Sequence, residues 1–261
     1  MRARARRRLA RAGTATAPSL DVTQARRTRR YPRPTQFDYL HLRRLVDDLE
    51  SAIARITDSS ATEVLDIYCG SRPYEDLLPT GARCTGMDIE GNPYGMADIV
   101  SNEFLPFEDG SFDLVTCYEA FHYVEDPEYG VREIRRVLRP GGGVLISVPF
   151  VWEYDQTILE HRYTGPELAA LFQGWEDVRV IENGGRAVAW ATLTGTILER
   201  GRARIPVALG LGAAARGAFS LVYVALNGLA SVLDALERRS PGGPLTLPMN
   251  LLLTARKPTD G

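Results

Sequence analysis

Residues 64–77, VLDIYCGSRPYEDL, carry the clearest structural signal of the chain. A short apolar run reaches an acid, Asp66, and a turn and a segment of helical character follow it. Gly70 in this turn allows the backbone to approach a ligand closely. A buried strand, a tight turn and a helix open many α/β ligand-binding folds. The stretch therefore predicts a ligand-binding loop after the first strand of such a fold.

Strands and helices alternate around this loop. Apolar residues at i, i+3, i+4 and i+7 predict an amphipathic helix over 36–56. The pattern predicts a further helix at 127–140, and Thr164 with Glu167 forms a capping box that starts another. Predicted strands lie at 63–67, 83–89, 97–100, 111–118, 141–149, 175–182 and 248–258. This alternation predicts an α/β fold with a doubly wound, mostly parallel, seven-stranded sheet and flanking helices.

Composition and charge set the class of protein. The chain has 261 residues, of which 44% are hydrophobic, and a net charge of −2, which is ordinary for a globular protein with a sizeable core. The first 30 residues hold ten arginines and one acid, and they lack the apolar stretch of a secretory signal. We expect residues 1–34 to be a basic, disordered tail, with an organelle transit peptide as the alternative. Residues 35–261 are expected to form one domain.

The cysteines indicate the compartment. Cys69, Cys84 and Cys117 are scattered and show no zinc-ligand spacing. An odd, dispersed set favours a reducing environment. We therefore expect a cytoplasmic protein and no metal site.

A second acid strengthens the prediction of a ligand site. Asp88 ends the second predicted strand, about 20 residues after the glycine turn, where an acid can accept hydrogen bonds from both hydroxyls of a ribose. A surface acid at a strand end is the ordinary alternative. The turn and the acid together favour the ligand site over that alternative.

Four segments in sequence order carry a family resemblance: VLDIYCGSRPY, GMDI, LPFEDGSFDLV and YEAFHYVEDPEYGVREIRRVLRPGGGVLISVP. Over about 63–149 the chain resembles the class I S-adenosylmethionine-dependent methyltransferases, in particular the methyltransferase type 11 group. The CGSRPY form is similar to a bacterial subgroup in which a segment like HRYTGPEL follows the fifth strand, as it does here. The resemblance implies a Rossmann-like fold, S-adenosylmethionine as cofactor and methyl transfer as activity. The cofactor half is expected at about 60–150.

The resemblance also implies roles for residues in the first two loops. Asp66 and Gly70 are expected to line the methionine end of the cofactor, and Ser71 in the same turn joins the cofactor-binding set. Asp88 is expected to hold the ribose, with Ile89 against the adenine. All five residues belong to the two segments that match the family pattern.

Residues after the third and fourth strands complete the implied cofactor site. Asn102, with Ser101 as competitor, is expected to meet the amino group of the adenine. Tyr118 and Glu119 are expected beside the reactive sulfonium. These assignments, too, rest on the resemblance.

Two positions depart from the family pattern. Tyr68 replaces the first glycine of the loop, and Arg72 replaces the last. If the Tyr68 ring entered the methionine pocket it would block the cofactor, whereas packing elsewhere would leave the loop intact. Since Arg72 precedes Pro73, we expect Arg72 to be extended and Pro73 to lie in the first turn of a helix over PYEDLL.

Two histidines are candidates for acid–base chemistry. Transfer to an oxygen acceptor often needs a base, and imidazole titrates near neutrality. His122 and His161 are the natural candidates, with local structural roles as the alternative for both. We expect the acceptor side of the site within about 151–245.

Residues 205–236 form an apolar stretch before the last strand, which is expected at about 248–257. The stretch predicts a helical insertion with polar residues recurring at helical spacing: Ser220, Asn227, Ser231, Asp234 and Arg238. We expect it to pack on the domain, with contact to a membrane surface or a lipid substrate as the alternative. A membrane span is least expected, because the uncharged run is slightly short.

The sequence thus predicts a methyltransferase that acts on oxygen in a small-molecule, lipid or glycan acceptor. A non-catalytic partner subunit of the same fold is one alternative. A nicotinamide-dependent oxidoreductase is the less favoured one, because the sequence holds no GxGxxG. No specific nucleic-acid partner is expected, since the body of the chain is acidic. The location expected is cytoplasmic, with peripheral membrane contact through 205–236.

Overall fold

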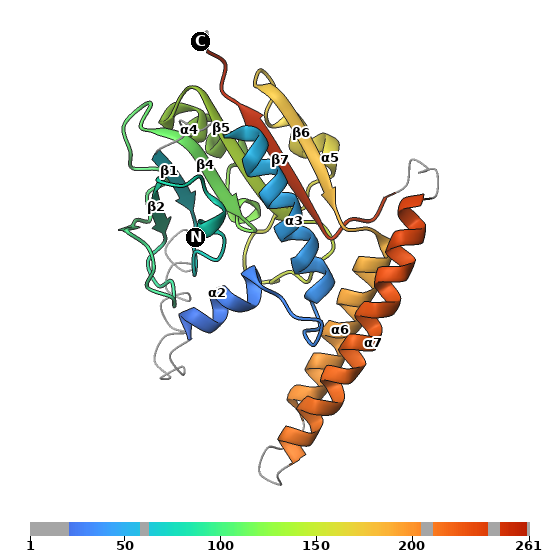
Figure 1. Cartoon of the computed structure of the whole chain (residues 1–261). Helices are drawn as coiled ribbons and strands as arrows, with labels where there is room; N and C mark the ends of the chain where they lie inside the picture. Colours follow the sequence, from blue (N-terminus) through green and yellow to red (C-terminus); the bar gives the residue numbers. More distant parts are fainter. Residues whose placement is uncertain (1–20, 58–62, 205–210, 240–245, 260–261) are drawn as a thin grey trace.

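A seven-stranded sheet with helices on both faces forms the body of the molecule (Figure 1). The computed structural model describes residues 21–57, 63–204, 211–239 and 246–259. The strands are β1 (Glu63–Ile67), β2 (Arg83–Asp88), β3 (Ile99–Val100), β4 (Phe112–Tyr118), β5 (Leu138–Pro149), β6 (Glu176–Asn183) and β7 (Asn250–Arg256). Their order is β3-β2-β1-β4-β5-β7-β6, and β7 runs antiparallel to both its neighbours. The predicted α/β fold class is confirmed.

Helices connect and cover the strands. They are α2 (Val22–Arg30), α3 (Tyr39–Ile56), α4 (Pro127–Val137), α5 (Gly165–Ala170), α6 (Arg186–Ala203) and α7 (Leu211–Arg239), with short 3-10 helices η1 (Glu75–Leu77) and η2 (Phe121–Tyr123). Helix α3 packs its apolar face on the sheet, as its spacing predicts. Helix α4 ends at Val137 and not at residue 140, because Leu138 already pairs with Phe112 in the sheet. The capping box of Thr164 and Glu167 at α5 is confirmed.

The central strands bring the candidate loops to one edge of the sheet. Strand β1 lies between β2 and β4 and is parallel to both. Asp66 pairs in register with Gly86 on one side and Thr116 on the other. Because these three strands end at the same edge, the loops that follow them lie together.

The prediction of a disordered tail through residue 34 does not hold for the described part of that segment. Residues 22–30 form helix α2, which begins where the Asp21 side chain accepts a hydrogen bond from the backbone N–H of Gln24. Residues 1–20 lie outside the described residues. Ion pairs hold α2 to the body: Arg30 meets Asp76 at 2.9 Å and Glu50 at 3.0 Å.

The apolar insertion is a hairpin of two helices, of which the sequence predicted only the second. Helices α6 and α7 pack side by side and project away from the sheet (Figure 1). They meet the start of α3 in a core cluster of Leu40, Val188, Ala189, Ala191, Ala230 and Met249. Gly195 lets α6 approach Phe37, because a Cβ there would lie 2.9 Å from the Phe37 carbonyl oxygen. Residues 205–210 of the predicted insertion lie outside the described residues.

Candidate active site

Asp66 ends β1 as a buried carboxyl. The Thr116 hydroxyl donates a hydrogen bond to its Oδ1 at 3.1 Å. Burial raises the pKa of Asp66 to about 7, since a low-dielectric environment disfavours the charged form. Near neutral pH this carboxyl therefore exchanges readily between its two protonation states.

Gly70 and Asp88 connect the first two loops. The Gly70 N–H donates to Asp88 Oδ2 at 2.9 Å, and the Ile89 N–H donates to Oδ1 at 2.8 Å. The Asn92 side-chain amide is a further donor to Asp88. Gly70 has φ +55°, and the nearest atom to a Cβ built there is the Tyr68 carbonyl oxygen at 3.9 Å. The backbone at Gly70 is therefore open to close approach, as the sequence predicts.

Tyr68 packs against the hydrophobic core. Its half-buried ring lies beside the cluster between the sheet and α4, with its centroid 6.4 Å from that of Phe104. Phe104 in turn lies 6.2 Å from the Tyr129 ring. Burial raises the pKa of Tyr68 to about 12, so its hydroxyl stays neutral. The aromatic side chain in place of the loop glycine is thus held by packing.

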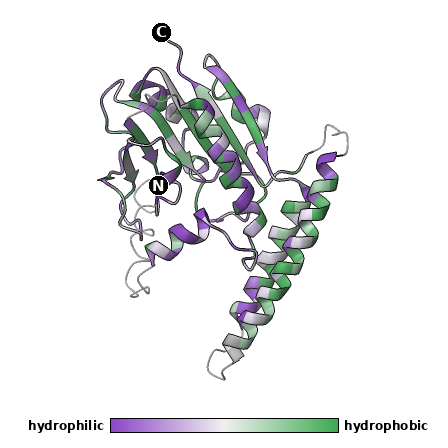
Figure 2. Ribbon diagram, viewed as in Figure 1, coloured by the Kyte–Doolittle hydropathy of each residue, from purple (hydrophilic) through white to green (hydrophobic). Residues whose placement is uncertain are grey.

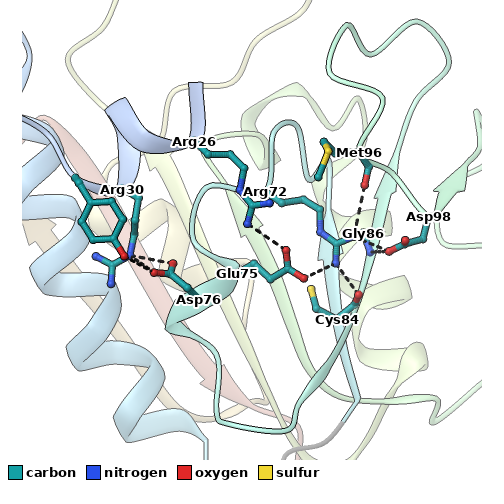
Figure 3. Close-up of polar contacts among 10 residues, drawn as sticks. Arg26, Arg30, Arg72, Glu75, Asp76, Cys84, Gly86, Met96 and Asp98 are labelled. Carbon is teal, nitrogen blue, oxygen red and sulfur yellow. Dashed lines mark hydrogen bonds and ion pairs between the residues drawn. The ribbon is translucent and has the colours of Figure 1, made fainter. Parts of the chain in front are cut away.

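Arg72 is left-handed and not extended, contrary to the prediction from Pro73. Its φ is +53°, and its guanidinium is buried. It donates to Asp98 at 2.7 Å, to Glu75 at 3.0 Å and to the Cys84 carbonyl at 2.6 Å (Figure 3). Arg26 of α2 meets the same Glu75 at 3.4 Å. Arg72 therefore fixes the turn after β1 to β2, and the predicted PYEDLL helix shrinks to the short η1.

The predicted adenine-side residues lie around Asp88. The Ser101 N–H donates to the Asp88 carbonyl at 3.0 Å. Asn102 reaches across to Glu90 at 3.4 Å, so the loops after β2 and β3 meet. Ile89 is 40% exposed at the start of the first of these loops, whereas Ser71 in the turn after β1 is buried.

The side chains of Glu119 and Tyr118 lie in different environments at the end of β4. Glu119 follows β4 with φ +54°, and its N–H donates to Ser147 Oγ at 2.9 Å. Its Oε1 is buried without a partner, and burial raises the pKa of Glu119 to about 7. The Tyr118 ring instead packs edge-on against Tyr74, with centroids 5.1 Å apart.

A cavity of about 780 Å³ begins at Glu119. This volume lies in the range of small-molecule sites. Helix α2, the start of α3, η2, the segment after β5 and the hairpin α6–α7 form its walls. Its lining includes Arg29, His41, Leu42, Leu45, Glu119, His122, Trp152, Glu199, Arg202, Arg216, Phe219 and Tyr223.

The two predicted histidines are placed differently. His122 lines the cavity with a buried, unpartnered Nδ1, and burial together with the charge of Arg162 lowers its pKa to about 4. The His161 ring stacks on Tyr163, with centroids 5.8 Å apart, and is not part of the cavity lining. The backbone N–H of His161 donates to the backbone carbonyl of His122 at 2.9 Å. The structure thus joins the two segments through the backbone.

Sequence reasoning missed His41 and Arg29. His41 of α3 is buried, lines the cavity with an unpartnered Nδ1, and lies 6.0 Å from the Trp152 ring. Burial, and then the charge of Arg29, lowers the pKa of His41 to about 4. The available signal was the place of His41 on the apolar face of its helix, next to Leu42. Arg29 was missed because its segment was taken as tail.

No cluster of metal-ligating side chains occurs in the described ranges. The possible binding groups are instead the carboxyls of Asp66 and Asp88, the open backbone at Gly70 and the unpartnered polar atoms of the cavity.

The part of the chain that forms the loop edge matches a known protein family. Residues 65–146 match the family described as methyltransferase domain, and the strand order with an antiparallel β7 accompanies that match. The match shows a methyltransferase domain over residues 65–146.

Curated relatives extend the match at the level of sequence. The chain is similar to the ubiquinone biosynthesis O-methyltransferase of Aromatoleum aromaticum, at 32% identity over 110 residues, covering 36% of this chain and 47% of the relative. The protein of the same name from Aeromonas salmonicida is 32% identical over 111 residues, covering 35% and 47%. The chain thus spans about half the length of the curated relatives it matches.

Solved structures share the fold. Phosphoethanolamine N-methyltransferase 2 of Haemonchus contortus, in complex with S-adenosyl-L-methionine, aligns with a TM-score of 0.50 and 16% identity, over 81% of this chain and 52% of that one. The [4+2]-cyclase SpnF aligns with a TM-score of 0.52 and 20% identity, over 82% and 81%. At these identities the likeness concerns the fold alone.

Proposed function

We propose that this protein transfers a methyl group from S-adenosylmethionine to an oxygen of a small-molecule, lipid or glycan acceptor. The observation that carries the proposal is the junction at Glu119, where the family's cofactor edge meets a cavity with buried, unpartnered polar atoms. The O-methyltransferase relatives support oxygen as the accepting atom.

The loop edge fits the cofactor that the family uses. When bound, the cofactor supplies a methyl group on a positively charged sulfur. Gly70 offers open backbone, and the Asp88 carboxylate stands at a strand end suited to ribose hydroxyls. In the proposal, Asp66 and Ser71 complete the methionine end, whereas Ile89, Ser101 and Asn102 surround the adenine.

Glu119 is the proposed proton acceptor. A general base works best when its pKa lies near the operating pH, and burial raises the pKa of Glu119 to about 7. His122 and His41, whose pKa values lie near 4, are neutral imidazoles that can hydrogen-bond an acceptor hydroxyl. His161 is proposed to position His122 through the backbone hydrogen bond between them. Tyr118, whose ring packs on Tyr74, stays a proposed member of the cofactor site.

The cavity favours an acceptor with an apolar portion. Trp152, Leu42, Leu45 and Phe219 line it beside the polar groups. Positioning such an acceptor and excluding water are the main tasks of the enzyme in an in-line displacement. We propose a cytoplasmic location for this enzyme.

Calorimetry of the purified chain tests the proposal. Titration with S-adenosylmethionine and with NADH, for the wild type and for Asp88→Ala, is expected to show binding of the first ligand only, weakened at least about tenfold in the variant. Asp47→Ala, which removes an exposed acid of α3, is the matched control and is expected to bind as the wild type does. Binding of NADH would indicate the oxidoreductase, and binding of neither ligand would indicate a non-catalytic partner subunit.

A further inference from the structure

Helix α7 turns its polar residues inward. Tyr223, Asn227 and Asp234 are buried. The Asn227 amide donates to the Gln36 carbonyl at 2.9 Å, and the Tyr223 hydroxyl donates to a Glu199 oxygen at 2.8 Å. Asp234 forms ion pairs with residues of α3 and α7. These contacts fix one side of α7 to the body of the protein.

The outward side of α7 is uncharged and mostly apolar. From Gly217 to Leu236, the exposed residues are Gly217, Ala218, Leu221, Val222, Val224, Ala225, Gly228, Leu229, Ser231, Val232, Leu233, Ala235 and Leu236. Leu221 is 73% exposed and Val232 58%. Even the Ser231 hydroxyl is turned to the Asn227 carbonyl, at 2.7 Å. A helix on a water-soluble protein shows the opposite arrangement.

The two helices α7 and α2 differ in hydropathy. Figure 2 shows hydrophobic residues over much of α7, whereas α2 is largely hydrophilic. Exposed apolar surface of this extent marks an interaction with a protein or a membrane. The stretch from Gly217 to Leu236 is about 30 Å long at 1.5 Å per residue.

The charge of the hairpin indicates which kind of partner binds the outward face of α7. Residues 186–239 hold seven arginines and three carboxylates, a net charge of +4, although the whole chain carries −2. Arg216 precedes the uncharged stretch, and the exposed Arg239 follows it after Glu237 and the ion-paired Arg238. Arginines at the ends of an apolar helix can place their charged heads among lipid phosphates while the stems lie along apolar surface. Attraction to anionic lipid is therefore expected.

The buried contacts argue for a helix that lies on the membrane. Ala214–Arg239 is long and apolar enough to cross a membrane by length and composition. A span would require Asn227 and Asp234 to leave their partners and enter hydrocarbon, which is costly. A helix with one polar face fixed to the protein can instead bury its other face in the interface.

We propose that the outward face of α7 docks this protein on an anionic lipid surface. The other side of the same hairpin lines the acceptor cavity through Arg202, Arg216, Phe219 and Tyr223. Docking therefore brings the cavity to the membrane, and the acceptor is a molecule that partitions into lipid. The statement about the acceptor rests on the proposed function, whereas the docking does not.

Vesicle co-sedimentation of the full chain tests the docking. Vesicles of phosphatidylcholine alone and with phosphatidylglycerol are compared, for the wild type and for Leu221→Glu combined with Val232→Glu. The wild type is expected to bind the anionic vesicles, and the double variant is expected to bind at least about tenfold more weakly. The control is Leu159→Glu, because Leu159 is as exposed as Val232 but lies outside the hairpin; it is expected to bind like the wild type.

Three results would overturn the docking. They are absence of vesicle binding, binding that the double variant retains, and a dimer in light scattering that the double variant dissociates without any vesicle binding. Calorimetry with S-adenosylmethionine on the same samples separates the two proposals. Vesicle binding without cofactor binding would keep the docking and remove the methyl transfer.

Discussion

Replacement of Arg72 tests how the loop after β1 is held. Arg72→Ala removes the hydrogen bonds to Asp98, Glu75 and the Cys84 carbonyl and a long one, 3.5 Å, to the Met96 carbonyl. It leaves the backbone in the left-handed region. Arg72→Gly removes the same bonds but places at φ +53° the residue that tolerates this conformation. The two variants therefore separate the contribution of the side chain from that of the backbone.

The expected magnitude follows from the exposure of the partners. The Asp98 side chain is 52% exposed and that of Glu75 35%, so solvent weakens each ion pair to about 0.5–1 kcal/mol. Loss of the donor to the Cys84 carbonyl adds about 1 kcal/mol. Arg72→Ala is thus expected to lower the free energy of unfolding by about 2–3 kcal/mol. Arg72→Gly is expected to cost about 1 kcal/mol less, because a left-handed alanine is strained.

Urea unfolding followed by circular dichroism measures both variants. Arg43→Ala serves as control, since Arg43 is 59% exposed, meets Asp47 at 3.8 Å and donates a long hydrogen bond, 3.3 Å, to the Tyr39 hydroxyl. The expected cost of this exposed substitution is below about 0.5 kcal/mol. The reasoning fails if Arg72→Ala matches this control, or if Arg72→Gly is less stable than Arg72→Ala.

Three further predictions concern α2 and the cavity. Arg30→Met breaks the ion pairs with Asp76 and Glu50, so limited proteolysis is expected to cut residues 21–34 faster than in the wild type. An unchanged rate of cleavage would show that these ion pairs do not hold α2 to the body. Burial raises the pKa of Glu119 above its value in the unfolded chain, so stability is expected to fall as pH rises from about 4.5 to about 7. Glu119→Gln is expected to remove up to about 3 kcal/mol of this pH-dependent loss of stability, measured by urea titration at several pH values. If the variant and the wild type lose stability equally over this range, the raised pKa of Glu119 is refuted. His122→Leu removes an imidazole proposed to position the acceptor hydroxyl, so kcat is expected to fall about 100-fold while cofactor affinity in calorimetry is kept. A retained kcat would remove His122 from the reaction.

The sheet could be predicted because its strands have a strong local signal. Parallel strands covered on both faces are mostly apolar, and residues 64–67 of β1 and 143–149 of β5 are buried without interruption. The loop positions of Asp66, Gly70 and Asp88 followed from strand ends, because such ends define the ligand edge of the fold. The capping box at Thr164 was visible because both of its partners lie within one helical turn.

The remaining elements depend on contacts between distant segments. Helix α6 is rich in alanine, threonine and glycine on all sides, so it shows little apolar periodicity. Helix α2 has no buried residue and is held by ion pairs to residues far along the chain. Arg72 adopts its left-handed conformation because its buried guanidinium has partners on three segments. His41 lines a cavity because α2 and the α6–α7 hairpin, which are distant in sequence, form the other walls.

The position of α2 affects how this protein should be trimmed for study. An arginine-rich beginning is an obvious target for deletion before crystallisation or assay. Removal of residues 1–34 would also remove Gln24, Thr28 and Arg29, which form one wall of the cavity. A shortened protein could then keep its sheet and its loop edge and still lack a closed chamber for the acceptor. Inactivity of such a fragment would reflect the missing wall, and the cut is better placed before Asp21.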